Sequence, residues 1–135
     1  MKALDSSVLL ALLEGEAGAR EIQRRLRGVE VATTEANLLE LAYIAAQGPE
    51  RHRGARKEAL TRLRRKITIL PIDGRASETA AHHIGKGAEA APPLVSAMMG
   101  ALEANGCDEL LTLEPPASIG KWRVRVTRIS LHHPK

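Results

Sequence analysis

The segment Lys2-Ala3-Leu4-Asp5-Ser6-Ser7-Val8-Leu9-Leu10 decides the fold, because it joins a short buried strand directly to a helix. Residues 2–4 form the strand, and one of the two serines is a suitable N-cap for the apolar helical run at 8–13. The carboxylate of Asp5 therefore falls where the strand ends and the helix begins.

Strand-like and helical segments alternate along the rest of the chain. Short apolar runs predict strands at 2–4, 29–32, 67–70, 109–112 and 123–126. Capped helical patterns predict helices at 8–13, 19–26, 33–47, 50–65, 73–84 and 92–104. The alternation predicts an α/β fold, a three-layer α/β/α sandwich around a mostly parallel sheet of four or five strands. A length of 135 residues predicts one domain over 1–135.

Three acids fall beyond the ends of predicted strands. Asp5 follows the first strand, and Glu114 follows the fourth. Glu40 lies about a turn and a half into the helix for which Thr33 and Thr34 are the expected caps. Ligand sites of parallel sheets lie beyond the carboxyl ends of the strands, so we expect the three carboxylates to converge at one edge. Acids held there beside hydroxyl groups gather a hard cation such as Mg2+.

The composition is that of a protein from a reducing compartment. Apolar residues make up 44% of the chain, enough for a core that lacks phenylalanine entirely. The single cysteine, Cys107, excludes an internal disulfide, and its apolar neighbours predict an inert packed thiol. No apolar run approaches the roughly 20 residues of a membrane span, and no signal peptide is visible. We therefore expect a cytoplasmic protein with no membrane partner.

Positive charge is concentrated at residues 51–66, which include most of the helix predicted at 50–65. The basic residues of this region, opposed there by Glu58, are Arg51, Arg53, Arg56, Lys57, Arg62, Arg64, Arg65 and Lys66. Such a face could bind RNA phosphates, with Arg62, Arg64 and Arg65 as the contacts, and the alternative is a solvated helix face. With one Tyr and one Trp in the chain, stacking platforms are nearly absent, so RNA recognition would use the backbone.

Three short motifs stand in order along the chain. They read Leu4-Asp5-Ser6-Ser7-Val8, then Thr33 followed by Leu39-Glu40-Leu41, and then Gly106-Cys107-Asp108-Glu109-Leu110-Leu111-Thr112-Leu113-Glu114. Together they resemble the PIN-domain family, which includes the VapC-type toxins of toxin–antitoxin pairs. The resemblance covers nearly the whole chain, including Leu70-Pro71-Ile72-Asp73 before the fifth helix.

The resemblance implies a metal-dependent endoribonuclease that holds Mg2+ or Mn2+ with a cluster of acids. Asp5 and Glu40 fall on the family's first and second acidic positions, and Glu114 falls on a late acid that is more usually Asp. Thr112 matches the polar residue near that site. The predicted catalytic residues are therefore these four, and the three acids are the predicted metal ligands. The implied partners are RNA and an antitoxin protein, and we expect a homodimer.

One position departs from the family pattern. The family usually supplies a further acid at the start of the helix predicted at 92–104, and this chain has Pro93 there. Proline cannot bind a metal, Ser96 offers a neutral oxygen, and Glu89 could substitute only if its loop folds back. The cation site is therefore expected to be weak, held by one or two carboxylates with waters and substrate phosphates. The alternative function is a catalytically impaired PIN-like domain that binds RNA or a protein.

Ordinary structural roles compete with some of these assignments. Asp5 is also a good helix N-cap, and Glu114 could be a loop acid before two prolines. Glu40 is flanked by leucines and so borders the buried face, where an unpartnered carboxylate is costly. That position favours an ion-paired or functional role for Glu40.

Other polar residues have simpler interpretations. Glu35 is expected to compensate the charge of a helix end, and Thr34 and Asn37 are expected to be cap and surface residues. The pairs His82-His83 and His132-His133 do not indicate zinc, because adjacent histidines on a helix face different ways and no third ligand is near.

Overall fold

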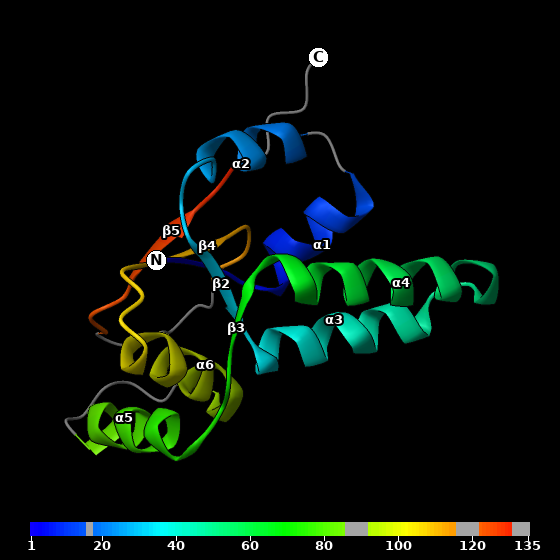
Figure 1. Cartoon of the computed structure of the whole chain (residues 1–135). Coiled ribbons are helices and arrows are strands. Elements are labelled where there is room, and N and C mark those ends of the chain that lie inside the picture. The colour runs from blue at the N-terminus through cyan, green and yellow to red at the C-terminus, as the bar shows by residue number, and fades with distance from the viewer. Residues whose placement is uncertain (16–17, 86–91, 116–121, 131–135) are drawn as a thin grey trace.

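The computed structural model describes residues 1–15, 18–85, 92–115 and 122–130 and shows a sheet flanked by helices (Figure 1). Within these residues the sheet has five strands, all parallel, in the order β3-β2-β1-β4-β5. The strands are β1 (Lys2–Leu4), β2 (Val31–Thr34), β3 (Thr68–Leu70), β4 (Glu109–Thr112) and β5 (Arg125–Arg128). The predicted α/β fold is confirmed, and β1 lies at the centre of the sheet.

The helices connect these strands in the way that parallel pairing requires. They are α1 (Ser6–Glu14), α2 (Ala19–Arg25), α3 (Glu35–Gln47), α4 (Glu50–Lys66), α5 (Gly74–Gly85) and α6 (Pro93–Ala104). In the part of the chain that the structure describes, no helix is both long enough and apolar enough to cross a membrane.

The central strands send alternate side chains into two apolar clusters, one on each face of the sheet. Ala3 and Leu110 pack in one cluster with residues of α6. Leu4 and Leu111 pack in the other with residues of α1, α2 and α3. Strands buried on both faces are typical of a parallel sheet covered by helices. The two clusters confirm the three-layer architecture.

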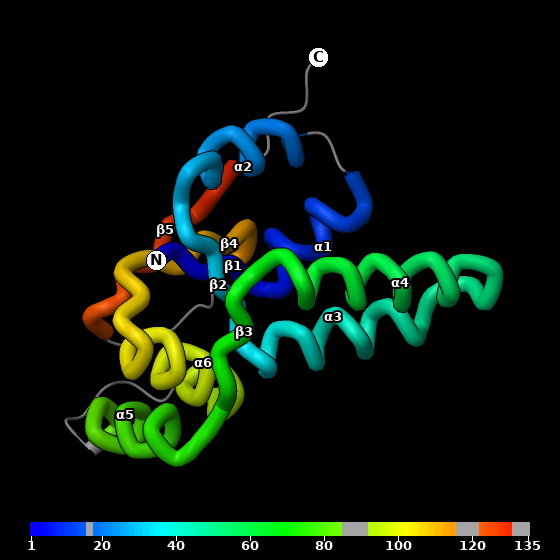
Figure 2. The backbone as a smooth tube through the Cα atoms, viewed as in Figure 1, coloured from blue at the N-terminus to red at the C-terminus, as the bar shows by residue number. Residues whose placement is uncertain are grey.

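Helices α3 and α4 run side by side away from the sheet (Figure 2). Near the sheet, the Arg64 guanidinium of α4 donates two hydrogen bonds to the Glu35 carboxylate of α3, at 3.2 and 3.1 Å. At the far end, Arg53 Nε donates to the Gly48 carbonyl at 3.2 Å. The two helices therefore contact each other at both ends of α4.

Close packing against α5 sets the position of α6. A Cβ atom at Gly100 would lie 2.3 Å from the Ala76 carbonyl oxygen, so no larger residue fits between the helices. Such an approach needs a residue without a side chain. It holds α6 in place, including the first turn from Pro93.

A buried acid joins three strands at the amino-terminal end of β4. The Glu109 carboxylate accepts hydrogen bonds from Lys2 Nζ at 2.5 Å, Thr127 Oγ1 at 2.6 Å and Arg125 Nε at 3.1 Å. The hydrogen bond from Lys2 is the main reason that the Glu109 pKa falls to about 2. We call this arrangement the Glu109 cluster.

Two predicted strands were placed about two residues too early. The second strand was expected at 29–32, but the Val29 amide donates to the Leu26 carbonyl at 3.1 Å in a turn, and β2 begins at Val31. The last strand was expected at 123–126, but the Arg123 amide donates to Glu103 Oε1 at 2.8 Å, and β5 begins at Arg125. A turn before β2 and a bond to α6 before β5 thus use the backbone amides that were expected to belong to the strands.

Two predicted caps also differ. Thr33 belongs to β2, where its hydroxyl donates to the Leu4 carbonyl at 2.8 Å, while Thr34 is the N-cap of α3. The N-cap of α1 is Asp5 rather than Ser6 or Ser7. A carboxylate accepts the free amide of the first turn and also favours the positive end of the helix dipole.

Candidate functional site

A pocket of about 230 Å³ opens beyond the carboxyl ends of β1, β2 and β4. We call it the acid pocket. Its lining residues are Asp5, Ser6, Ser7, Ala36, Asn37, Glu40, Leu94, Val95, Met98 and Glu114. The three acids expected to converge therefore line one pocket, at the edge of the sheet where ligands of parallel α/β folds bind.

Asp5 is fixed by both neighbouring elements. Its amide donates to the Leu111 carbonyl at 3.2 Å, which ties it to β4. Its Oδ1 accepts from the Ser7 hydroxyl at 2.6 Å and from the Val8 amide at 3.2 Å, which caps α1. Both of these side-chain bonds are accepted by Oδ1.

A chain of hydroxyl groups connects Asp5 to the backbone that leads to Glu114. Besides donating to Asp5, Ser7 Oγ accepts from the Leu113 amide at 2.9 Å and lies 3.4 Å from Thr112 Oγ1. Thr112 Oγ1 accepts from the Glu114 amide at 3.1 Å. Thr112 itself is fully buried and does not line the acid pocket. Its geometry favours a positioning role for Thr112 rather than contact with a substrate.

Glu40 is exposed, so the expectation that it borders the buried face is wrong. The neighbouring Leu39 is 66% exposed, which shows that this side of α3 faces solvent. The Glu40 carboxylate nevertheless has a fixed partner, because Ser6 Oγ donates to its Oε2 at 2.8 Å. The start of α1 therefore orients Glu40 toward the pocket that Asp5 lines.

Asn37 was expected at the surface, but it is only 2% exposed. Its Oδ1 accepts from the Ser6 amide at 3.3 Å, and its Nδ2 donates to Thr34 Oγ1 at 3.0 Å. Asn37 thus links α3 to the start of α1 at the floor of the acid pocket. A short polar side chain three residues after an N-cap threonine is a weak signal for such a link.

The donors of the acid pocket fit a loosely held divalent cation. Carboxylates are the ligands that Mg2+ prefers, and one or two of them are enough when water and phosphate complete the shell. In the ranges that the structure covers, however, no three His, Cys, Asp or Glu residues come together as a metal-binding group. From α6 the pocket receives Leu94, Val95 and Met98, which bring no oxygen donor. Glu89, the possible substitute for an acid at Pro93, lies outside the described residues.

The structure describes one of the two histidine pairs, His82-His83. His83 Nε2 lies 2.6 Å from the Glu103 carboxylate, and its ring packs against Trp122 with centroids 4.4 Å apart. His132-His133 lies outside the described residues.

Two of the three arginines predicted to bind RNA have carboxylate partners in the structure. Arg64 pairs with Glu35, and Arg62 lies 3.6 Å from Glu58. All four side chains are exposed, and exposed ion pairs are weak enough for a phosphate to replace the carboxylate. Arg65 is also exposed.

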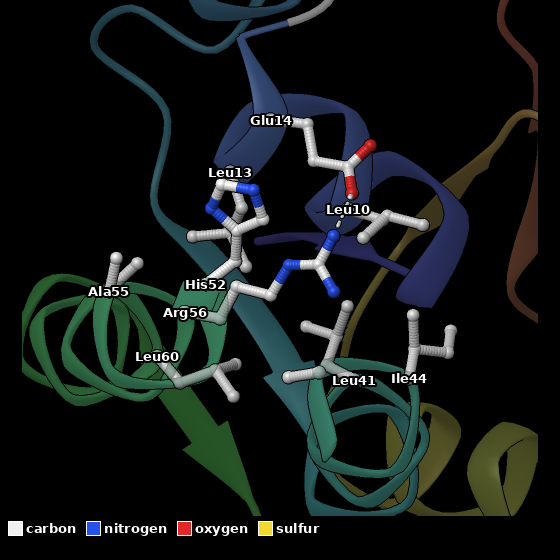
Figure 3. Close-up of a pocket in the computed structure, with 11 residues that line it drawn as sticks. Leu10, Leu13, Glu14, Leu41, Ile44, His52, Ala55, Arg56 and Leu60 are labelled. Carbon is white, nitrogen blue, oxygen red and sulfur yellow. Dashed lines mark ion pairs between the residues drawn. The ribbon is translucent and has the colours of Figure 1, made fainter. Parts of the chain in front are cut away.

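A second and larger pocket, of about 510 Å³, lies between α1, α3 and α4 (Figure 3). We call it the apolar groove. Its larger apolar lining residues are Leu10, Leu13, Leu41, Ile44 and Leu60. The Arg56 guanidinium also lines the pocket and points toward Glu14, with 3.7 Å between the charged atoms (Figure 3). The groove combines apolar side chains with charged ones, as surfaces that bind amphipathic segments do.

The sequence pattern of the PIN domain matches residues 2–88. None of the curated proteins matches the chain in sequence.

Several solved structures have the same fold. VapBC2 from Rickettsia felis, bound to a DNA fragment from its promoter, has a TM-score of 0.73 and 9% identity, over 96% of this chain and 98% of that one. VapBC-5 from Mycobacterium tuberculosis has a TM-score of 0.66 and 20% identity, over 95% and 98%. VapC20 from the same organism, a Sarcin-Ricin loop cleaving toxin, has a TM-score of 0.59 and 16% identity, over 82% and 87%.

The matched PIN domain covers more than half of the chain and includes Asp5 and Glu40. The parallel five-stranded sheet agrees with the fold of the similar solved structures. The chain therefore belongs to the PIN-domain family.

Proposed function

We propose that this protein is a metal-dependent endoribonuclease of the VapC type and the toxin of a toxin–antitoxin pair, built as one domain over 1–135. The main support is that the carboxylates of Asp5, Glu40 and Glu114 line one pocket without a basic partner among the described residues. One or two carboxylates are enough to hold Mg2+ when water and substrate phosphate complete its shell. The similar toxin described as cleaving the Sarcin-Ricin loop supports RNA as the substrate.

The chain's own groups have distinct parts in this proposal. Asp5 Oδ2 and the Glu40 carboxylate would hold Mg2+ or Mn2+, with Glu114 acting directly or through water. Ser7 and Ser6 orient these two acids through their hydroxyl groups. A bound cation supplies polarisation of the scissile phosphate and of the attacking water.

Cleavage of a structured RNA in Mg2+, Mn2+ or EDTA tests the proposal. Asp5→Asn should abolish cleavage, and the fold should survive because asparagine is as good an N-cap as aspartate. Asp73→Asn is the matched control, since Asp73 Oδ1 accepts from the Ala76 amide at 3.1 Å at the start of α5 and Asp73 does not line the acid pocket. Cleavage that persists in EDTA or in Asp5→Asn would refute the proposal.

The runner-up function is a catalytically impaired PIN-like domain that binds RNA or a protein. The observation that favours it is the wall of the pocket made by α6, where Pro93 and its neighbours bring no carboxylate. If RNA bound the wild-type protein in Mg2+, in Mn2+ and in EDTA and stayed intact each time, the result would support this function instead.

The basic helix α4 is the proposed path of the RNA backbone. Its Arg64 pairs with Glu35 at the start of α3, next to Ala36 and Asn37 of the acid pocket. Charge reversal at Arg62, Arg64 and Arg65 should weaken the binding of unrelated RNAs about equally and flatten its salt dependence. The matched control is charge reversal at Arg20, Arg24 and Arg25, which are exposed on α2. Equal effects of the two triple variants would mean that α4 is an ordinary solvated face.

Two protein partners are also proposed. The similar VapBC structures are complexes, which supports an antitoxin as the occupant of the apolar groove between α1, α3 and α4. A homodimer is supported by Leu39 and Tyr43, each 66% exposed on α3.

The proposed compartment is the cytoplasm. The thiol of Cys107 is buried and burial raises its pKa, which suits a reducing compartment.

A further inference from the structure

The acid pocket has two chemically different sides. Asp5, Ser6, Asn37 and Glu40 bring oxygen atoms from the starts of α1 and α3. The side formed by α6 is aliphatic and consists of Leu94, Val95 and Met98. Any substrate that fills the pocket must therefore present a polar group to one side and an apolar group to the other.

The aliphatic side is part of a fixed helix. Leu94 lies in the first turn of α6, directly after Pro93, whose ring suits the start of a helix. Behind it Met98 is only 7% exposed, and α6 is locked against α5 at Gly100. Leu94 is 44% exposed, so it presents an apolar surface to whatever enters the pocket.

The size of the pocket selects the kind of group that can enter. At about 230 Å³ it is smaller than the roughly 300–1,000 Å³ of sites that hold drug-sized ligands, and a helix of a partner protein does not fit. In RNA, the group next to a phosphate that has a broad apolar face is the nucleobase. The chain has one Tyr and one Trp and neither lines this pocket, so an aliphatic side chain has to make the contact that aromatic rings make elsewhere.

We infer that Leu94, supported by Val95 and Met98, contacts the face of the nucleobase whose phosphate would bind the cation held by Asp5 and Glu40. This inference rests on the proposed ribonuclease function and adds a residue that determines substrate preference. An aliphatic contact accepts the face of any base, so Leu94 requires that a base be present without reading its sequence.

The test compares two non-cleavable RNA probes of equal length and charge. One is an oligoadenylate phosphorothioate RNA, and the other is the same phosphorothioate backbone without bases. Leu94→Ala should weaken binding of the first probe about five- to tenfold, the effect of losing on the order of 50 Å² of apolar contact, and should leave the second unchanged. Leu94→Met, which keeps an aliphatic side chain, should bind both probes like the wild type. Ile84→Ala is the control, because Ile84 is 53% exposed on α5 and lines neither of the two pockets described above.

Probe binding tests the contact between Leu94 and a nucleobase, and RNA cleavage tests the ribonuclease function, so the two can fail separately. An equal loss on both probes would overturn the inference, because Leu94 would then contact the ribose or stabilise the pocket. No loss on either probe would overturn it as well, because Leu94 would then make no contact with the RNA. Base-dependent binding through Leu94 in a protein that does not cleave RNA would keep the inference and remove the nuclease function. RNA cleavage by a protein in which Leu94→Ala does not change probe binding would keep the nuclease function and overturn the inference.

Discussion

The two ends of the sheet hold carboxylates in opposite ways. At the amino-terminal end of β4, Glu109 is buried and bonded to Lys2 and Arg125, so its charge is neutralised inside the protein. At the carboxyl end, Asp5 and Glu40 are held by the hydroxyl groups of Ser7 and Ser6, which orient a carboxylate without cancelling its charge. The first arrangement stabilises the fold, and the second leaves negative charge ready for an external cation.

The comparison teaches that partner chemistry, rather than the presence of an acid, separates a structural carboxylate from a candidate ligand. A charge-assisted hydrogen bond from lysine or arginine lowers the pKa of a carboxyl group, and Glu109 shows this with a pKa of about 2. A hydroxyl donor orients the carboxylate but brings no positive charge, so the carboxylate can still bind a metal. Substitutions at the two ends should therefore affect different properties.

The largest expected difference is in activity. Glu40→Gln removes a charge that no residue of the described chain neutralises, so RNA cleavage should fall on the order of 10²- to 10³-fold. The free energy of unfolding should change by less than about 0.5 kcal/mol, because the residue is exposed. Initial cleavage rates and urea denaturation measure the two effects. A Glu40→Gln variant that cleaves RNA normally would remove Glu40 from the site.

The reverse pattern is expected for Glu109. Glu109→Gln leaves Lys2 and Arg125 without their counter-ion at a nearly buried position. The free energy of unfolding should fall by about 1–3 kcal/mol, less than for a fully buried pair because Arg125 is mostly exposed. Cleavage measured well below the unfolding midpoint should stay within about twofold of the wild type. If Glu109→Gln lost most of its cleavage and kept its stability, Glu109 would serve the site rather than the fold, and the two ends of the sheet would not differ in this way.

The sequence predicted the acid pocket better than the Glu109 cluster for a physical reason. Asp5 and Glu114 follow strands, and the order of parallel strands alone brings such positions to one edge. The Glu109 cluster depends on Lys2 and Arg125, which are distant in sequence, and no local pattern reports which strand ends lie together. The same limit concealed the bond from Ser6 to Glu40, the burial of Asn37 and the pairing of Arg64 with Glu35.

Acid titration sharpens the comparison further. The folded pKa of Glu109 is lowered from 4.5 to about 2, so its contribution to stability is complete above about pH 4.5 and is lost as the pH falls toward 2. Glu109→Gln should therefore flatten the dependence of the unfolding free energy on pH within this window. Denaturation at several pH values between about 2 and 5 measures the slope. An unchanged slope in the variant would mean that the bonds from Lys2 and Thr127 do not persist in solution.

The smallest expected effect comes from adding a cation, and it tests the acid pocket without any RNA. Binding to the folded state alone raises stability by mass action, and a site with few protein ligands is weak. At Mg2+ or Mn2+ concentrations about tenfold above the dissociation constant, the gain is about 1.4 kcal/mol, which raises the melting temperature by a few degrees. Asp5→Asn should lose this rise, whereas Glu109→Gln should melt at a lower temperature and still show it in full. If both variants responded to the cation alike, the ion would bind elsewhere, and the carboxylates beside Ser6 and Ser7 would be oriented for some other ligand.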